Sequence, residues 1–197
     1  MDNALTDQRL ARVFELLDGR LARNGAPRAG IVVCGGAAMI ATGLVSRTTT
    51  DVDIVALVDD ALLLVAPVPL PAHLIRAATE VAETLGLPAD WLNNGPSRDE
   101  GGLFQMGLPE GFQERLHARV YGSHLTVYFA DRIDQIHFKL YAAVDRGGYH
   151  ISDLEALRPT DDELTRSCTL GAHARCIGRI CRVVETRTSG TGTWKSR

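Results

Sequence analysis

Two aspartates separated by one residue, Asp51 and Asp53, are the side chains of this chain best suited to metal chemistry. They lie in residues 51–58, DVDIVALV, which have the composition of a buried strand. Residues two apart in a strand point to the same side, so both carboxylates project together, opposite Val52 and Ile54. Burying both charges is costly unless a cation neutralises them. The spacing predicts a site for Mg²⁺ (or Mn²⁺), which prefers one or two carboxylates with phosphate oxygens and water.

A simpler interpretation of the same aspartates needs no metal. Asp51 would only start the strand, and Asp53 would form an ion pair with Arg47.

Two glycines, Gly35 and Gly36, end an apolar run at residues 29–34 that suits a buried strand. Residues 37–44 follow as a short predicted helix, whose first N–H groups and positive dipole end would face a ligand over the strand end. Glycine also allows close approach of the backbone. The glycine pair is therefore a candidate phosphate-binding site, and the alternative is a tight turn between strand and helix.

A lone internal lysine, Lys139, lies in a helix predicted for residues 132–145. The chain has one other lysine, Lys195, and otherwise uses arginine, so a compact ammonium here suits a phosphate contact. A solvated helix residue is the alternative. Arg146 follows seven positions later, on a similar side of the helix. Asp131, just before the helix, is a candidate catalytic residue or an N-cap.

The elements that must position these residues can be read from periodicity and turn residues. Helices are predicted at 5–23, 37–44, 72–86 and 132–145, and strands at 29–34, 51–58, 117–121 and 124–130. Residues 91–111 are rich in Gly, Asn and Pro and predict a long loop. Asp153 opens a short helical piece, and Thr160 with Glu163 has the spacing of a capping box.

The composition is that of an ordinary globular protein, with 197 residues, 45% hydrophobic and 23% charged. A net charge of -3 disfavours an extended duplex-binding surface. No secretory signal or membrane-spanning stretch is found, so we expect a cytoplasmic location and no membrane partner. Four cysteines indicate reduced thiols rather than a disulfide framework. Zinc ligation and burial in a helix are both open for four C-terminal residues: Cys168, His173, Cys176 and Cys181.

These motifs together resemble a known family. Gly35-Gly36 followed by Arg47-x-Thr49-x-Asp51-x-Asp53 resembles the signature of the nucleotidyltransferase (polymerase β-like) superfamily, in the small bacterial branch related to AbiE-type nucleotidyltransferase toxins. Lys139, Arg146 and Asp153-Leu154 add to the match, which covers roughly residues 5–158.

The resemblance implies an α/β (α+β) chain with the minimal nucleotidyltransferase fold, a mixed sheet flanked by helices and followed by a helical segment. The implied divisions are a nucleotidyltransferase-like domain (1–158), a helical segment (159–185) and a disordered tail (186–197). Asp51 and Asp53 would hold Mg²⁺ against a nucleoside triphosphate (NTP). The implied nucleotide-binding residues are Gly35, Gly36, Arg47, Thr49, Lys139 and Arg146.

Family members often carry a third carboxylate on a later strand. The segment 125–130 has none, which leaves Asp131 and Asp153 as candidates.

The implied reaction transfers a nucleoside monophosphate from an NTP to a hydroxyl of RNA such as tRNA, of a protein or of a small molecule. It would belong to a toxin–antitoxin or phage-defence system. A catalytically inactive binding module, an antitoxin or regulator that contacts a cognate partner protein, is the alternative. A zinc-containing nucleic-acid adaptor is a third hypothesis.

Overall fold

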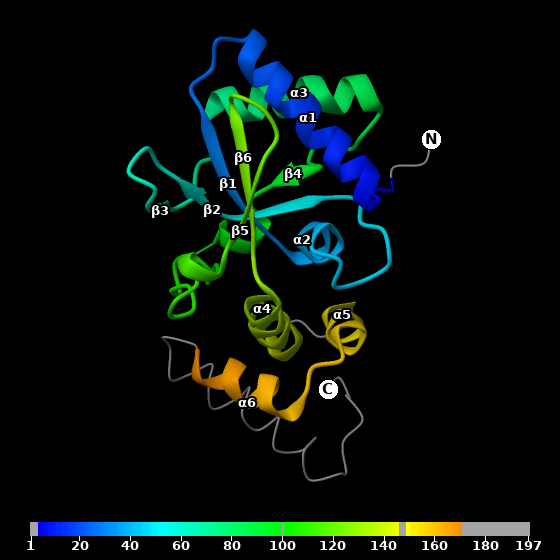
Figure 1. The fold of residues 1–197 in the computed structure, drawn as a ribbon, viewed down its shortest axis with the longest axis vertical. Helices are drawn as coiled ribbons and strands as arrows, with labels where there is room; N and C mark the ends of the chain where they lie inside the picture. Colours follow the sequence, from blue (N-terminus) through cyan, green and yellow to red (C-terminus); the bar gives the residue numbers. More distant parts are fainter. Residues whose placement is uncertain (1–3, 100, 146–148, 171–197) are drawn as a thin grey trace.

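The computed structural model of the protein describes residues 4–99, 101–145 and 149–170. Within these ranges the chain is α+β, with six α-helices flanking a mixed sheet of six strands (Figure 1). The helices are α1 (Asp7–Arg23), α2 (Gly35–Ala41), α3 (Ala72–Leu85), α4 (Arg132–Asp145), α5 (Tyr149–Leu157) and α6 (Asp161–Thr169). The strands are β1 (Ala29–Cys34), β2 (Val52–Val58), β3 (Leu64–Val65), β4 (Leu92–Asn93), β5 (His117–Val120) and β6 (Leu125–Phe129). The predicted fold class, a mixed sheet with C-terminal helices, is confirmed.

The sheet is built around β1. Its strand order is β3-β2-β1-β6-β5, and β4 also pairs with β2. β1 runs antiparallel to β2 and parallel to β6, while β5 and β6 form the predicted antiparallel hairpin. The pairing of β1 with β2 sets Cys34 opposite Asp53, which brings the aspartate pair beside the glycine turn that follows β1.

The two faces of the sheet are covered differently. α1, α2 and α3 pack on one face, and their core cluster includes Val52 and Ile54. The other face contributes Val32 and Val55 to a cluster with Phe138 of α4 and the segment preceding β5. Because Val52 and Ile54 belong to the first cluster, Asp53 projects from the second face, as predicted.

The three C-terminal helices gather at the other end of the molecule from α1 and α3 (Figure 1). A third core cluster joins α2 to α4, α5 and α6 through Met39, Ile136, Leu140, Leu154, Leu157 and Leu164. The capping box predicted at the start of α6 is confirmed, with Thr160 and Glu163 bonding each other's backbone N–H groups.

Several predicted boundaries were wrong. α2 begins at Gly35 and ends at Ala41, because Gly43 has a left-handed φ of 71° that a helix cannot continue through. β2 begins at Val52, one residue late. α5 begins at Tyr149, so Asp153 lies inside a helix rather than at its start. The segment 91–111 also contains β4 and a short 3₁₀ helix, η1 (Gly95–Ser97).

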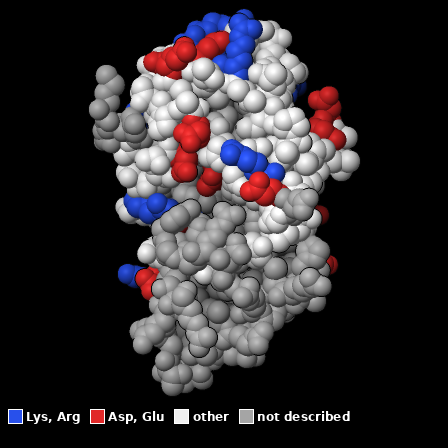
Figure 2. All heavy atoms as spheres, turned by 180° about the vertical axis from the view of Figure 1, so that it is seen from behind, with Lys and Arg blue, Asp and Glu red and all other residues white. Residues whose placement is uncertain are grey.

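Charged side chains of both signs are interspersed in small groups on the face shown in Figure 2, without a continuous basic tract among the described atoms. This distribution agrees with the net charge of -3. Among the helices of the described ranges, none has both the length and the apolar character needed to cross a membrane.

Candidate active site

The first glycine of the pair lies against Asp53. Gly35 has a left-handed φ of 69°, and a Cβ built on it would lie 2.8 Å from Oδ2 of Asp53. An L-amino acid there would be strained by the backbone and would crowd the carboxylate. Gly35 therefore makes room for Asp53 where β1 gives way to α2.

The second glycine makes room for the turn that leads into β2. A Cβ on Gly36 would lie 2.8 Å from Thr49 Oγ1 and 3.1 Å from Arg47 Nη2. The Thr49 hydroxyl donates to Asp51 Oδ1 at 2.8 Å, which orients that carboxylate. The structure therefore brings both glycines, Arg47, Thr49 and both aspartates together.

The electrostatics around Asp53 favour a bound cation. Burial and, to a smaller extent, the negative charge of Asp51 together raise the pKa of Asp53 to about 6. A hydrogen bond from Asn93 and the positive charge of Lys139 act in the opposite direction without cancelling the rise. The pair therefore carries negative charge that the protein only partly compensates.

Lys139 and Arg47 both bind Asp153. Lys139 Nζ lies 2.6 Å from Asp153 Oδ2, and Arg47 Nη2 lies 2.8 Å from Asp153 Oδ1. The Asp153 side chain is only 8% exposed. Arg47 thus pairs with Asp153, and the simpler interpretation in which Arg47 pairs with Asp53 is not supported. Asp153 ties α5 to α4 and to the turn that precedes β2.

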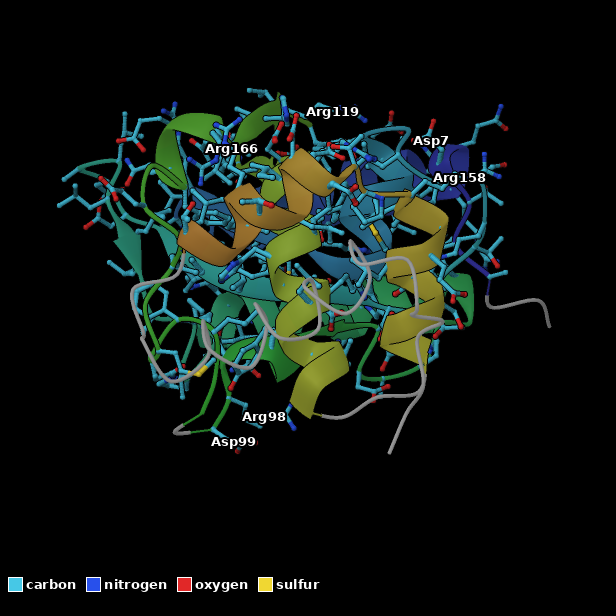
Figure 3. All side chains as sticks on the ribbon, turned by 90° about the horizontal axis from the view of Figure 1, so that it is seen from below. Asp7, Arg98, Asp99, Arg119, Arg158 and Arg166 are labelled. Atoms are coloured by element: carbon cyan, nitrogen blue, oxygen red, sulfur yellow. The ribbon has the colours of Figure 1, made fainter. Side chains whose placement is uncertain are left out.

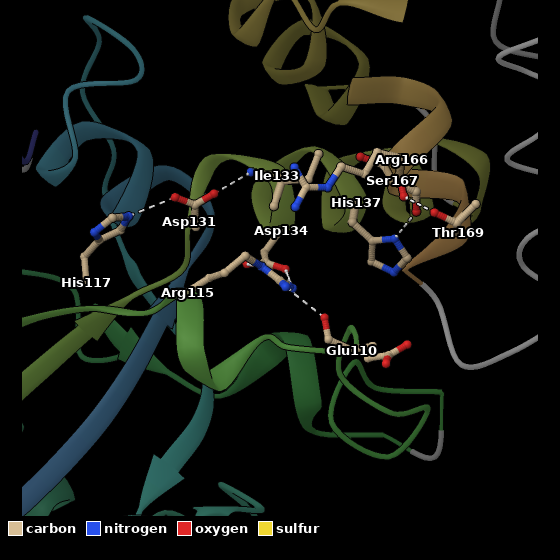
Figure 4. A network of polar contacts seen from close by, with 10 residues as sticks. All are labelled: Glu110, Arg115, His117, Asp131, Ile133, Asp134, His137, Arg166, Ser167 and Thr169. Carbon is tan, nitrogen blue, oxygen red and sulfur yellow. Dashed lines mark hydrogen bonds and ion pairs between the residues drawn. The ribbon is translucent and has the colours of Figure 1, made fainter. Parts of the chain in front are cut away.

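Asp131 is engaged at the start of α4 (Figure 4). Its Oδ1 accepts the N–H of Ile133 at 3.0 Å, as an N-cap does, and its Oδ2 lies 2.9 Å from His117 Nε2. Although burial opposes ionisation, these hydrogen bonds hold the pKa of Asp131 below its ordinary value. The bond to Ile133 supports the N-cap interpretation, and Asp131 does not line the cavity beside Asp53.

A cavity of about 220 Å³ opens beside Asp53. Its wall combines a carboxylate and an ammonium with apolar groups from α4 and from the segment after β4. The lining residues are Cys34, Gly35, Asp53, Gly95, Pro96, Gly101, Leu103, Phe138, Lys139, Tyr141 and Ala142. Burial raises the pKa of the Cys34 thiol far above its ordinary value, so the thiol stays neutral. Arg98 and Asp99 extend outward from the same segment (Figure 3).

One buried contact was not anticipated from the sequence. The N–H of Gly35, a predicted nucleotide-binding residue, donates to Oε1 of Gln135 at 3.0 Å, so this amide is occupied by a side chain. The signal available in the sequence was spacing. Gln135 lies four residues before Lys139 and therefore on the same face of α4.

Some expected ligands lie outside the described residues: Arg146, His173, Cys176 and Cys181, together with the side chain of Cys168. Within the described part of the chain, no group of three or more His, Cys, Asp and Glu side chains is placed to hold a metal ion.

Comparison with known proteins gives no relative for this chain. No protein-family model, curated protein or solved structure matches it.

Proposed function

We propose that the protein is a Mg²⁺-dependent nucleotidyltransferase that moves a nucleoside monophosphate from an NTP to a hydroxyl acceptor. The observation that carries the proposal is Asp53, which lies beside the negative charge of Asp51 and lines a cavity together with Lys139. A carboxylate pair opposite a lysine provides the two kinds of contact that a metal-bound triphosphate requires.

The donor set fits Mg²⁺ (or Mn²⁺). Asp53 has a pKa of about 6 because burial and Asp51 disfavour its charge, and a divalent cation would relieve both effects. Thr49 keeps one oxygen of Asp51 fixed, which leaves Oδ2 for a metal. A bound metal would stabilise charge on the attacking and leaving oxygens.

The remaining side chains position phosphate. Lys139 is a compact cation on the wall shared with Asp53, and Asp153 holds its Nζ at 2.6 Å. In the proposed reaction the acceptor oxygen bonds to the α-phosphorus, the bond to pyrophosphate breaks, and the hydroxyl proton is released. RNA, a protein or a small molecule would supply the hydroxyl, in the cytoplasm where NTP is available.

The test uses each α-labelled NTP with Mg²⁺ and a cell extract as the acceptor source. We expect the native protein to label an acceptor. The Asp51→Ala, Asp53→Ala double variant should give at least about a hundredfold less label, because the triphosphate is no longer held in position for the reaction. The matched control is Asp60→Ala, Asp90→Ala, which removes two exposed aspartates that do not line the cavity. Labelling that persists in the first variant contradicts the mechanism.

A catalytically inactive nucleotide-binding module is the second candidate. It is favoured by the engagement of both proposed third carboxylates, since Asp131 caps α4 and Asp153 binds two cations. Such a module would bind a cognate toxin or antitoxin. Calorimetry separates the two functions, because Mg²⁺-dependent NTP binding without turnover supports the module.

A further inference from the structure

A buried hydrogen bond connects α4 to the glycine turn beside Asp53. Gln135 is fully buried, and its Oε1 accepts the N–H of Gly35 at 3.0 Å. Gly35 has the left-handed φ of 69°, and a Cβ built on it would lie 2.8 Å from Oδ2 of Asp53. The orientation of this peptide therefore decides how closely the backbone can approach Asp53.

The same helix face carries Lys139. Residues four apart on a helix are neighbours on its surface, so one rotational setting of α4 directs Gln135 to Gly35 and Lys139 into the cavity. A bond between Gln135 and Gly35 fixes that setting at the first turn of α4. This setting of α4 and the ion pair of Nζ with Asp153 together place Lys139 on the cavity wall that it shares with Asp53.

Hydrogen-bond satisfaction alone does not account for a glutamine at this position. Its Nε2 is buried and finds no partner in the described part of the chain. A leucine would remove that unpaired donor but would leave the buried N–H of Gly35 unpaired instead. Glutamine and leucine would each leave one buried donor unpaired, so hydrogen-bond satisfaction favours neither residue. What distinguishes the glutamine is that it orients the Gly35 peptide.

We propose that Gln135 is a positioning residue of the nucleotide site, which fixes the Gly35 peptide beside Asp53 and holds Lys139 at its distance from the carboxylate pair. This inference rests on the proposed function for its consequence in nucleotide binding. The positioning itself is a property of the ligand-free protein.

The lysine content of the chain supplies a direct probe. With only Lys139 and Lys195 present, ¹³C-lysine labelling gives two side-chain signals, which Lys195→Arg assigns. The variants are Gln135→Leu, which removes the acceptor, and Gln135→Glu, which keeps an acceptor oxygen in nearly the same place. The control is His137→Leu, which removes a partly buried hydrogen bond from the same helix to the Ser167 carbonyl, on the α6 side.

In the ligand-free protein, Gln135→Leu should accelerate exchange of the Gly35 amide about fivefold or more and shift the Lys139 signal. Gln135→Glu should preserve the amide protection, and His137→Leu should leave both readouts unchanged. Mg²⁺ with each of the four NTPs should then bind Gln135→Leu about tenfold more weakly than the native protein.

Native Gly35 exchange and an unmoved Lys139 signal in Gln135→Leu overturn the inference, as does equal loss of amide protection in Gln135→Glu. A different result overturns the proposed function. If no NTP with Mg²⁺ perturbs the Lys139 signal of the native protein, nucleotide binding fails, while the ligand-free measurements still decide the positioning role.

Discussion

The carboxyl group of Asp53 is partly buried beside Asp51 and has a pKa of about 6, above its ordinary value of 3.8. A raised pKa means that the folded state binds the proton more tightly than the unfolded chain does. The stabilisation that the folded state gains from binding this proton is complete below about pH 4 and is lost as the pH rises through about 6. At neutral pH the ionised Asp53 therefore opposes folding.

Asp53→Asn should stabilise the ligand-free protein at about pH 7.5 by about 1–3 kcal/mol, because it removes the cost of that charge. The gain should disappear near pH 4, where the native carboxyl is itself protonated. Urea unfolding at both pH values measures it, with the exposed Asp60→Asn as control. Equal stability of the native protein and Asp53→Asn at pH 7.5 would contradict the argument.

Gly36→Ala should lower the free energy of unfolding by about 1–3 kcal/mol, since its Cβ would crowd Thr49. Thr49 orients Asp51, so Mg²⁺-dependent NTP binding should weaken as well. Thermal unfolding and calorimetry report the two effects. In Gly19→Ala, in α1, the new Cβ would have no neighbour within 4 Å beyond the adjoining residues and the backbone of its own helix, so this variant should instead be neutral or stabilising. Similar behaviour of both variants would show that the glycine turn is not tightly packed.

At the scale of elements, α4 is anchored by an ion pair between the partly exposed Arg115 and the buried Asp134 (Figure 4). Arg115, at the end of η2 (Gln113–Arg115), donates to Asp134 through Nε at 3.0 Å and Nη2 at 2.6 Å. Its Nη1 also donates to the Glu110 carbonyl at 2.8 Å. Asp134 is fully buried, and burial raises its pKa despite the bonds from Arg115. The pair fixes the start of α4 against the segment before β5.

Arg115→Leu should destabilise the protein by about 3–5 kcal/mol, because it leaves the buried Asp134 without a cation. Adding Asp134→Leu should restore much of the loss, since no uncompensated charge then remains. Denaturant unfolding of the native protein, both single variants and the double variant gives the coupling free energy between Arg115 and Asp134. Arg12→Leu serves as control, because its ion pair with Glu15 is exposed and should change stability by less than about 1 kcal/mol. A double variant no more stable than Arg115→Leu would argue against this account.

Elements with a local signal could be predicted from the sequence. α1 has a strong apolar stripe and its N-cap Thr6, and α6 has its capping box. β3 and β4 were missed because strands of two residues show no periodicity. The early start of α5 was missed because the glycines at 147 and 148 mark a break without fixing the first helical residue.

The residues of the candidate site also differ in whether the sequence predicts them. Asp51 and Asp53 could be identified because both lie in one short motif whose spacing has a geometric meaning. The ion pair of Arg47 with Asp153 and the bond of Gly35 to Gln135 join distant parts of the chain. Such pairings depend on how helices pack, which residue types alone do not specify. The nucleotidyltransferase resemblance stays a prediction.

For the whole molecule, binding of the proposed substrate should increase the stability of the folded protein. Mg²⁺ and NTP together should raise the free energy of unfolding by about 2.7 kcal/mol at a hundred times the dissociation constant, because only the folded state binds. Either component alone should have a smaller effect, since the metal site needs phosphate oxygens for completion. Thermal melts with Mg²⁺, NTP and both provide the measurement. An equal shift in the Asp51→Ala, Asp53→Ala variant would place the binding elsewhere.

The parallel pairing of β1 with β6 also has a consequence for the order of folding. β1 and β2 are neighbours in sequence and pair locally, whereas β1 meets β6 only after more than ninety residues, with Ile31 opposite Val127. Contacts between distant segments form slowly, because a long loop must close first. We therefore expect the chain to assemble Gly35 and Asp53 early, while Lys139 and Asp153 arrive with the C-terminal helices. The acidic part of the site would therefore form before the ion pair of Lys139 with Asp153.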